Sequence, residues 1–145
     1  MRTFKHLAAL FFILCTFDAA YACSCVRPGP PCNYYGDAAA IFLGRVVGSV
    51  ERKTSVDANG NKTVYDVGTI RFLVLENYKG APGYEIEIHS STSGGECGYW
   101  FLRNEIYIVY AYRDPRTNLL STDTCTRTKH VSAAAEDCIG LRDSP

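Results

Sequence analysis

Apolar residues recur with the period of β-strands along much of the chain after residue 40. In residues 69–75, for example, Ile70, Phe72 and Val74 occupy every second position. A period of two places alternate side chains on one face of a strand, so these segments indicate strands with one buried face. The expected strands are residues 40–50, 63–78, 84–89, 105–112 and 119–125.

Glycines shape the first two of these strands. Gly44 and Gly48 interrupt the first strand and indicate bulges or a tight barrel bend. The polar stretch 51–62 follows, and it contains the pair Asn59-Gly60. Asn-Gly between two β-rich runs is a strong hairpin signal, and the long arms predict a hairpin that projects beyond the body.

Short helices are expected near both ends of the domain. Residues 33–40 can form one, with Asn33 or Asp37 near its start. Residues 131–138 can form a second, with Ser132 as its N-cap and an end near Gly140. The intervening pattern is that of strands, which makes the chain mainly β.

Five strands in a chain of this size predict a five-stranded, OB-like Greek-key barrel with short terminal helices. Closure into a barrel leaves few strand edges exposed. A β-sandwich is the alternative, and periodicity does not separate the two.

The first 22 residues have the organisation of a secretory signal peptide. Arg2 and Lys5 precede the apolar run 7–17, and Ala20-Tyr21-Ala22 forms an A-x-A cleavage site. No later run is apolar and long enough for a membrane helix, which takes roughly 20 residues. We therefore expect a soluble, secreted, extracellular protein whose single domain is residues 23–145.

The charge of the expected mature chain argues against polyanionic partners. Arg2, Lys5 and Asp18 leave with the signal peptide, so 13 basic and 14 acidic side chains remain in 123 residues. Nucleic acids and anionic membranes require a basic face. We expect neither partner, no membrane insertion, and a monomer.

Cysteine usage is the most informative feature of the composition. The six cysteines that follow the signal peptide form an even set, which in a secreted chain predicts three disulfides. Three lie at the start of the mature chain and three in its last third, and six cysteines allow 15 pairings. A bridge between the two groups would close a loop of roughly 100 residues, worth about 4 kcal/mol in the chain-entropy model. The six are Cys23, Cys25, Cys32, Cys97, Cys125 and Cys138.

Cleavage after Ala22 would make Cys23 the first residue, with a free α-amine, a carbonyl and a sulfur on one residue. These groups could together bind a partner, and three other interpretations of this terminus exist. Cys23 can be an ordinary half-cystine, or a bacterial lipoprotein anchor, although Ala20 and Tyr21 fit that signal poorly. The Cys-x-Cys pair can also be redox-active or a metal site, although it has no histidine nearby.

Other candidate chemistry is sparse, and we do not expect an enzyme. His89 and His130 have no partner at metal-ligand spacing and are expected at the surface. Trp100 and its aromatic neighbours are expected in the core. The serine cluster 90–93 has neither a nucleophile elbow nor a base. No phosphate-binding glycine loop occurs, and no cofactor is expected.

Several segments together resemble the tissue inhibitors of metalloproteinases. Cys23-Ser24-Cys25-Val26 follows directly after a signal peptide, and a proline-rich link leads to a third cysteine. The resemblance covers the whole mature chain but only the N-terminal domain of the two-domain members of that family. Its other segments are Phe42-Leu43-Gly44-Arg45-Val46-Val47, Tyr78-Lys79-Gly80, Cys97-Gly98-Tyr99, Thr124-Cys125 and Cys138.

The resemblance implies a fold, a disulfide pattern and a mechanism. The fold is an OB-like, netrin-type barrel, and the disulfides are Cys23–Cys97, Cys25–Cys125 and Cys32–Cys138. The amine and carbonyl of Cys23 would chelate the catalytic zinc of a secreted or membrane-anchored metalloproteinase, so the metal belongs to the partner. The implied protease-binding residues are Cys23, Ser24, Cys25, Val26, Ser93, Gly94, Gly95, Glu96 and Cys97.

Within that set, Ser24 would point into the main specificity pocket of the protease, and residues 93–96 would lie beside it in the cleft. A non-inhibitory, netrin-like extracellular binding module, acting through its barrel or long hairpin, is the alternative function. The inhibitor requires cleavage directly before Cys23, and the binding module does not.

One modification site is expected. Asn61-Lys62-Thr63 is an N-x-S/T sequon beside the Asn59-Gly60 turn, which predicts a glycosylated Asn61 at the exposed hairpin tip.

Overall fold

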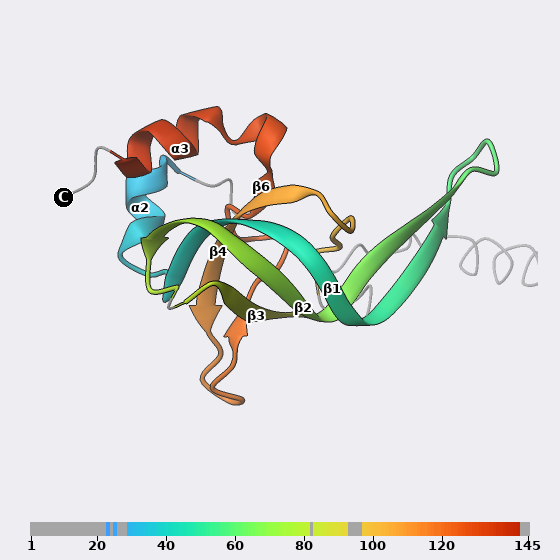
Figure 1. The fold of residues 1–145 in the computed structure, drawn as a ribbon, viewed down its shortest axis with the longest axis horizontal. Coiled ribbons are helices and arrows are strands. Elements are labelled where there is room, and N and C mark those ends of the chain that lie inside the picture. Colours follow the sequence, from blue (N-terminus) through green and yellow to red (C-terminus); the bar gives the residue numbers. More distant parts are fainter. Residues whose placement is uncertain (1–22, 24, 26–28, 82, 93–96, 143–145) are drawn as a thin grey trace, which may run out of the picture.

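Five strands form a closed barrel in the computed structural model, which describes residues 23, 25, 29–81, 83–92 and 97–142, without the side chains of Cys32 and Cys138. Pairing runs in the order β1-β2-β3-β5-β4, and β4 pairs with β1 to close the barrel (Figure 1). The strands are β1 (Ala40–Val56), β2 (Lys62–Lys79), β3 (Glu85–Ser90), β4 (Ile106–Arg113) and β5 (Leu120–Ser121).

The strand directions are those of an OB-type Greek-key barrel. All barrel pairs are antiparallel except β3 with β5, where His89 lies opposite Ser121 in a parallel arrangement. This parallel contact requires the chain to cross from β3 to β4 before it returns as β5. The predicted barrel is therefore confirmed, and the sandwich alternative is wrong.

Strands β1 and β2 are much longer than the barrel needs, and their outer halves project from it as a two-stranded hairpin (Figure 1). Their pairing continues to Val56 opposite Lys62. The predicted end of the first strand at residue 50 is therefore wrong. Residues 51–56 are mostly exposed on both faces, so no alternation of apolar and polar residues identified them as strand.

The tip of the hairpin is organised by Asp57. Its Oδ1 accepts the backbone N–H groups of Asn59 and Asn61 at 2.8 and 2.9 Å. Gly60 has a φ of +83°, a conformation that L side chains rarely adopt. The predicted Asn59-Gly60 turn is therefore present. The Asp57 carboxylate also stabilises it, which the Asn-Gly signal alone did not predict.

Both predicted glycine irregularities of β1 occur. The register of β1 against β2 shifts between Leu43 and Gly44 and again between Val46 and Gly48. A Cβ on Gly44 would lie 2.7 Å from the ring of Phe42. The first bulge therefore needs a residue without a side chain, and it increases the local bend that barrel closure requires.

The barrel interior is filled by the inward-facing residues of the strands. Phe72 contacts Phe42 and Phe101 edge to face, with ring centroids 5.6 and 5.2 Å apart. Phe101 in turn lies 4.9 Å from Tyr107. Such pairs contribute about 0.5–1.5 kcal/mol beyond their buried area. Other fully buried members are Ala40, Val46, Ile70, Ile88, Val109 and Ala111.

The remaining elements cover one side of the barrel. Helix α2 (Pro31–Tyr35) packs against α3 (Ala135–Arg142), which follows β6 (Lys129–His130) and the 3-10 helix η2 (Val131–Ala133) (Figure 1). A second buried cluster joins these helices to the outer faces of β1 and β4, which explains why both faces of those strands are apolar. It contains Ala38, Ile41, Ile108, Tyr110, Ala134 and Leu141.

The predicted bounds of the first helix are wrong. Helix α2 begins at Pro31. Proline is favoured at the first helical position because it lacks an N–H, and an N–H at that position would have no partner within the helix. It ends at Tyr35, not at residue 40, and neither Asn33 nor Asp37 is its N-cap, which is Pro30.

The C-terminal helix also differs from its prediction. Ser132 is not the N-cap of a single helix. His130 caps η2, and its ring accepts the N–H of Ser132. Gly140 does not end the helix but lies inside α3, where a Cβ would make an ordinary van der Waals contact with Pro31 of α2 at 3.6 Å.

The last predicted strand, residues 119–125, is reduced to the two residues of β5. Asp123 accepts the N–H groups of Cys125 and Thr126, so the backbone turns there instead of extending the ladder. The short strand β6 was not predicted, because two residues carry no periodic signal.

Candidate functional site

The residues that the family resemblance implies for protease binding fall into two groups. Cys23, Cys25 and Cys97 lie in the described part of the chain, and Cys23 is half-buried while Cys25 is exposed. The other six lie outside the described residues, namely Ser24, Val26, Ser93, Gly94, Gly95 and Glu96. The candidate site is therefore described through the anchors that hold its two ends.

Two of the three expected disulfides are present. Cys23 is bonded to Cys97 and Cys25 to Cys125, with Cα atoms 5.5 and 5.0 Å apart. The bonds span 74 and 100 residues of sequence, so both connect the start of the domain to its last third. The expected bond between Cys32 and Cys138 involves side chains outside the described part, although the helices that carry these residues pack together.

The two anchor cysteines lie on segments that are hydrogen-bonded to each other. The carbonyl oxygen of Cys97 accepts the N–H of Thr124 at 2.8 Å and its hydroxyl at 3.1 Å. The next residue, Gly98, pairs with Asp123 in an isolated antiparallel bridge. Cys125 follows Thr124 directly, so the sulfur attachments of Cys23 and Cys25 are tied together through the backbone.

The turn that carries Cys125 is organised by the carboxylate of Asp123. Its Oδ1 accepts the N–H groups of Cys125 and Thr126 at 2.8 and 3.0 Å. Its Oδ2 accepts the hydroxyl of Tyr112 at 3.1 Å, which joins the turn to β4. Burial, followed by the charge of Asp123, raises the pKa of Tyr112 to about 12, so this phenol stays a donor over the physiological range.

The segment after Cys97 is equally constrained. The buried hydroxyl of Ser90 donates to the carbonyl of Tyr99 at 2.8 Å and accepts its N–H at 2.7 Å. Gly98 passes so close to β3's extension that a Cβ there would lie 1.9 Å from the carbonyl oxygen of Ser91. Cys97 itself has a φ of +56°, which is uncommon for a residue with a side chain.

A buried charge network lies behind the Cys125 turn. Asp137 is fully buried and accepts hydrogen bonds from Arg127 at 2.8 Å, Lys129 at 2.9 Å and the hydroxyl of Tyr110 at 2.8 Å. Arg127 also donates to the carbonyl of Gly29, in the segment between Cys25 and α2. One network therefore connects the start of the domain, β4 and α3.

The same contacts set the ionisation of this network. Burial alone would raise the pKa of Asp137, but the hydrogen bonds from Arg127, Lys129 and Tyr110 outweigh it and lower the pKa. Burial, together with the hydrogen bond to Asp137, raises the pKa of Tyr110 well above its usual value. At neutral pH the network is therefore a carboxylate that receives two cationic donors and one neutral donor.

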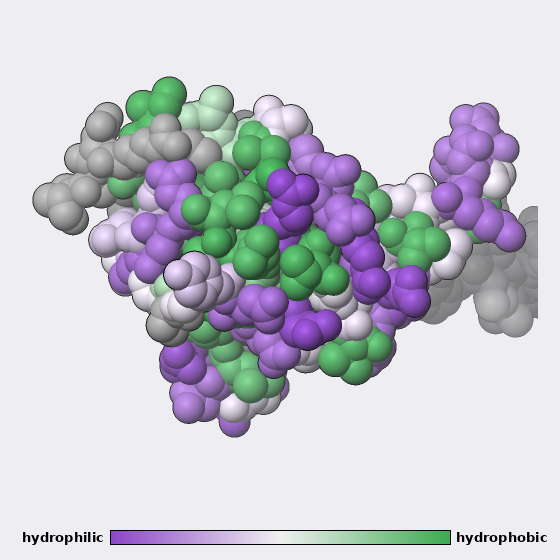
Figure 2. Space-filling view, in the orientation of Figure 1, coloured by the Kyte–Doolittle hydropathy of each residue, from purple (hydrophilic) through white to green (hydrophobic). Residues whose placement is uncertain are grey.

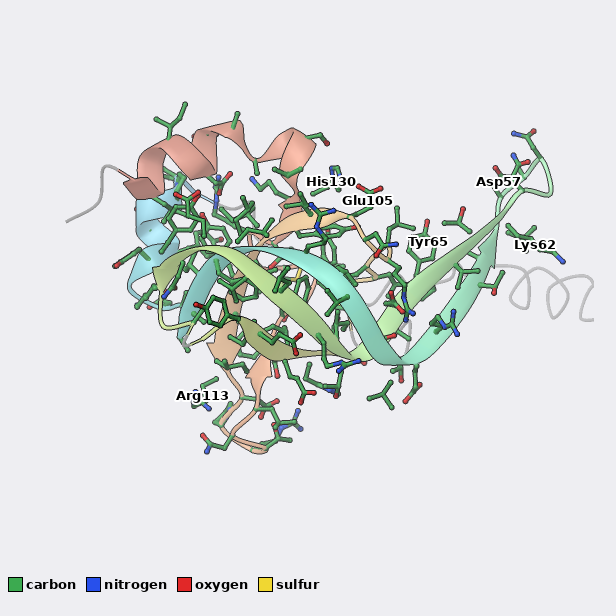
Figure 3. All side chains as sticks on the ribbon, viewed as in Figure 1. Asp57, Lys62, Tyr65, Glu105, Arg113 and His130 are labelled. Carbon is green, nitrogen blue, oxygen red and sulfur yellow. A yellow bond between two sulfur atoms is a disulfide. The ribbon has the colours of Figure 1, made fainter. Side chains whose placement is uncertain are left out.

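The two histidines differ from each other. His130 is partly exposed, and its Nε2 lies 3.0 Å from Oε2 of Glu105 (Figure 3). His89 is also partly exposed, but its Nδ1 is buried without a hydrogen-bond partner among the described groups, a feature that the expectation of an ordinary surface residue did not include. Within the described ranges, no group of three or more His, Cys, Asp or Glu residues could hold a metal ion.

The prediction that Trp100 lies in the core is also wrong. Its neighbour Phe101 is fully buried, but Trp100 is half-buried outside the barrel, with its ring centroid 5.6 Å from that of Tyr65. The ammonium of Lys53 lies 5.9 Å from the Trp100 ring. This cluster supports the base of the projecting hairpin.

The expected glycosylation site lies where the sequence placed it. Asn61 is exposed and directly precedes Lys62, which Figure 3 labels near the hairpin tip together with Asp57. Its Nδ2 donates to Oδ2 of Asp57 at 2.9 Å.

These features define a disulfide-anchored OB-type barrel whose N-terminal residues are attached to one rigid edge. No helix in the described ranges is long and apolar enough to cross a membrane. Comparison with protein-family models and with curated proteins finds no match.

Sequence reasoning found the anchors but missed the groups that lock them. Asp123 and Thr124 stood inside a predicted strand, although Asp two residues before a turn is a known signal for side-chain capping of backbone N–H groups. Nothing in the sequence pairs Arg127 with Asp137, because a buried ion pair depends on how separate elements pack.

Proposed function

We propose that the mature protein is a secreted inhibitor of zinc metalloproteinases that chelates the catalytic zinc of the protease through the amine and carbonyl of Cys23. One observation carries the proposal. Both cysteines of the Cys-x-Cys segment are bonded to neighbouring segments that are themselves hydrogen-bonded together, through Cys97 and Thr124. The start of the domain is thereby held on the barrel edge.

The chemistry of a terminal cysteine suits this role. A catalytic zinc has three protein ligands and one position that is open to water. A neutral α-amine and the carbonyl of the same residue can replace that water as a five-membered chelate. The α-amine has a reference pKa of about 7.7–8.0, so deprotonation costs little near neutral pH, and zinc favours the neutral form further.

Rigidity converts this chemistry into affinity. A flexible terminus would lose conformational freedom on binding, at about 0.5–1.5 kcal/mol for each immobilised side chain. In this protein the disulfides and the Asp123 turn order both anchors before any partner arrives. Less conformational entropy is therefore lost on binding than with a flexible terminus, which increases the affinity.

The other site assignments follow from the resemblance to the tissue inhibitors of metalloproteinases. Ser24 would enter the main specificity pocket, and Ser93, Gly94, Gly95 and Glu96 would lie beside it in the cleft. Val26 would continue the contact, and Cys32–Cys138 would complete the disulfide set. The zinc belongs to the protease, so the proposal requires no cofactor in this chain.

The proposal requires secretion and removal of residues 1–22. Two disulfides that link distant segments are compatible with an oxidising, extracellular location. N-terminal sequencing of the secreted protein should therefore begin at Cys23.

The decisive experiment compares the native-terminus protein with a form that carries one extra Ala before Cys23. Acylating the α-amine delocalises its lone pair, and the added residue pushes the chain into the metal. We expect one-to-one inhibition by the native form across a panel of zinc metalloproteinases and loss of most affinity in the extended form. Peptide mapping should show intact disulfides in both. Equal inhibition by both forms would rule out chelation.

Changing Ser24 sharpens the same test. A small polar side chain fills a deep apolar pocket poorly, so Ser24→Gly should weaken most targets only modestly. A larger apolar residue should redistribute preference among proteases whose pockets differ in depth. An identical change of affinity for every protease would argue against Ser24 in a specificity pocket.

A non-inhibitory binding module is the second candidate, and the projecting hairpin favours it. Its two strands carry three exposed valines, Val50, Val56 and Val64, which are 79, 57 and 49 % exposed. An isolated two-stranded ribbon gains little stability from exposed apolar residues, so these valines are available to contact a partner. Absence of inhibition by the native-terminus protein over a broad protease panel would favour this candidate.

Glycosylation of Asn61 is proposed for either function. The sequon is exposed at the tip of the hairpin that projects from the barrel (Figure 1). Protein secreted through an endoplasmic reticulum should lose mass on glycosidase treatment, and Asn61→Gln should abolish that loss. An unchanged mass of the wild-type protein would refute the proposal.

A further inference from the structure

A polar cavity of about 260 Å³ lies beside β3, β5 and the β4–β5 turn. It is distinct from the Cys23 edge, although both include the Asp123 turn. Small-ligand sites are concave and contain a few polar groups that fix orientation. The lining residues that matter here are His89, Tyr112, Asp114, Arg116, Ser121 and Asp123.

Two groups at this cavity are buried without hydrogen-bond partners. Ser121 is only 4 % exposed, and its Oγ has no partner among the described groups. Nδ1 of His89 is likewise buried and unpaired, and the two residues are neighbours because they pair across β3 and β5. Most buried polar atoms in proteins are hydrogen-bonded, so two unpaired atoms at one cavity indicate that something else meets them there.

The cavity also carries one unused acceptor and one unused cationic donor. Oδ1 of Asp114 accepts the N–H groups of Arg116 and Thr117 at 2.7 and 3.2 Å, whereas Oδ2 accepts none in the described ranges. Those backbone hydrogen bonds lower the pKa of Asp114, so it is an ionised acceptor at neutral pH. The guanidinium of Arg116 has no hydrogen bond or ion pair within the described part of the chain.

The second carboxylate is already occupied. Asp123 receives three donors, from Cys125, Thr126 and the hydroxyl of Tyr112. It therefore adds negative potential, with most of its acceptor capacity already used. With two carboxylates and one guanidinium, the cavity disfavours phosphate, sulfate and other anions.

We propose that this cavity binds a small, uncharged polyol, namely a single sugar residue of a glycan or a free monosaccharide. A sugar hydroxyl both donates and accepts, so neighbouring hydroxyls can donate to Asp114 and accept from Arg116 at the same time. Ser121 and His89, which also line the cavity, supply further hydrogen-bonding capacity, and Tyr112 offers an apolar ring for C–H groups. Affinity for one sugar unit is expected on the order of 1 mM.

The test is a titration followed by NMR amide shifts of the isotope-labelled mature protein. Glucose, galactose, mannose, fucose and N-acetylglucosamine are added separately, with inorganic phosphate and free arginine as charged comparisons. At least one neutral sugar should give saturable shifts centred on residues 89, 112–117 and 121–123. Phosphate and arginine should give weaker or no saturable shifts there.

Three variants assign the binding to the named groups. Asp114→Asn keeps an oxygen for the turn but removes the ionised acceptor, and Arg116→Ala removes the donor. Each should weaken sugar binding at least tenfold. Ser121→Ala should weaken binding while leaving the melting temperature equal to or above that of the wild type, because it removes an unpaired buried hydroxyl. Arg45→Gln, an exposed change on β1, is the matched control and should bind as the wild type does.

Separate outcomes would overturn the proposal. Absence of saturable shifts with every sugar would show that the cavity holds water only. Preferential saturation by phosphate or arginine would show a charged ligand class instead. Unchanged sugar affinity in Asp114→Asn and Arg116→Ala would place the sugar elsewhere. None of these readouts involves a protease, so the result is independent of the proposed inhibition.

A glycan bound at this cavity would lie close to the proposed inhibitory edge. Asp123 lines the cavity and also holds the turn of Cys125, to which Cys25 is bonded. The proposed site would thus place the protein on a glycosylated surface with its N-terminal edge nearby. To distinguish a glycan from a free sugar, the intact protein is bound to an array of immobilised glycans, and the free monosaccharide is added as a competitor.

Discussion

The N-terminal edge and the projecting hairpin are held in contrasting ways. At the edge, two disulfides, the Asp123 turn and a buried carboxylate with three donors hold the chain from several directions. Outside its base, where Lys53 and Tyr65 contact Trp100, the hairpin is stabilised by its own ladder and the Asp57 turn, and its tip is hydrophilic (Figure 2). Preorganised binding needs the first arrangement, whereas the second permits motion without loss of the fold.

The hairpin joins the barrel at Asp66 on β2. Its side chain is 1 % exposed and accepts hydrogen bonds from Ser49 at 2.6 Å and from Arg103 at 2.8 and 3.1 Å. Its backbone also pairs with Phe101. The hairpin is therefore clamped at its base, and we expect local opening to stop there.

The largest effect is expected from Asp137→Ala, which leaves Arg127 as a buried cation without its partner. Breaking a buried ion pair from one side costs about 3–5 kcal/mol. Urea unfolding should show a loss of this size. Glu136→Ala, an exposed neighbour on the same helix, is the control and should change the unfolding free energy by less than about 0.5 kcal/mol. Equal losses in both variants would contradict the importance of the network.

The same carboxylate should make stability depend on acid pH. The pKa of Asp137 is lowered in the folded state, so its contribution is present above the unfolded pKa of about 3.9 and is lost as pH falls through the folded value. The unfolding free energy should fall more steeply below pH 4 in the wild type than in Asp137→Asn. Urea titrations at successive pH values measure this, and parallel curves would contradict it.

Gly98→Ala should have a smaller but clear effect on the edge. The new Cβ would lie 1.9 Å from the carbonyl of Ser91, so the backbone next to Cys97 must move. Overpacking of this kind costs about 1–3 kcal/mol. Gly36→Ala is the matched control, because a Cβ there meets nothing within 4 Å and φ is −61°. If Gly98→Ala unfolds at the same urea concentration as the control, the close approach is unimportant.

The smallest effect is expected at the hairpin tip. Asp57→Ala removes the acceptor for the N–H groups of Asn59 and Asn61, so hydrogen exchange of these amides should accelerate. The melting temperature should not change, because the clamp at Asp66 separates the tip from the barrel. Asp57→Asn retains an acceptor oxygen and should behave like the wild type. A lowered melting temperature in Asp57→Ala would show that the two regions are coupled.

Sequence patterns predicted the barrel well where one face of a strand is buried and the other is exposed. The alternation at Ile70, Phe72 and Val74 belongs to β2, and the glycines of β1 lie at its register shifts. Prediction failed where this asymmetry is lost. The outer arm of β1 is exposed on both faces, and β5 and β6 contain two residues each.

For the candidate site, the distribution of the cysteines allowed bonds between the start of the domain and its last third but did not select them. The pairs Cys23–Cys97 and Cys25–Cys125 came from the family resemblance, because six cysteines allow 15 pairings and a bond depends on which sulfurs folding brings together. The polar cavity at Ser121 and His89 had no signal at all. It arises from a parallel contact between strands that lie far apart in the sequence.

The sequence by itself determined the local conformations: which segments extend, where glycines relax them, where the chain turns and which residues are available to cross-link. These follow from side-chain size, branching and polarity within a few positions. Only the tertiary structure decided that Asp137 receives Arg127, Lys129 and Tyr110, that Cys97 and Thr124 are neighbours, and that β3 lies beside β5. Such contacts depend on barrel closure, which brings distant residues into a dry interior where an unpaired charge or hydroxyl is costly.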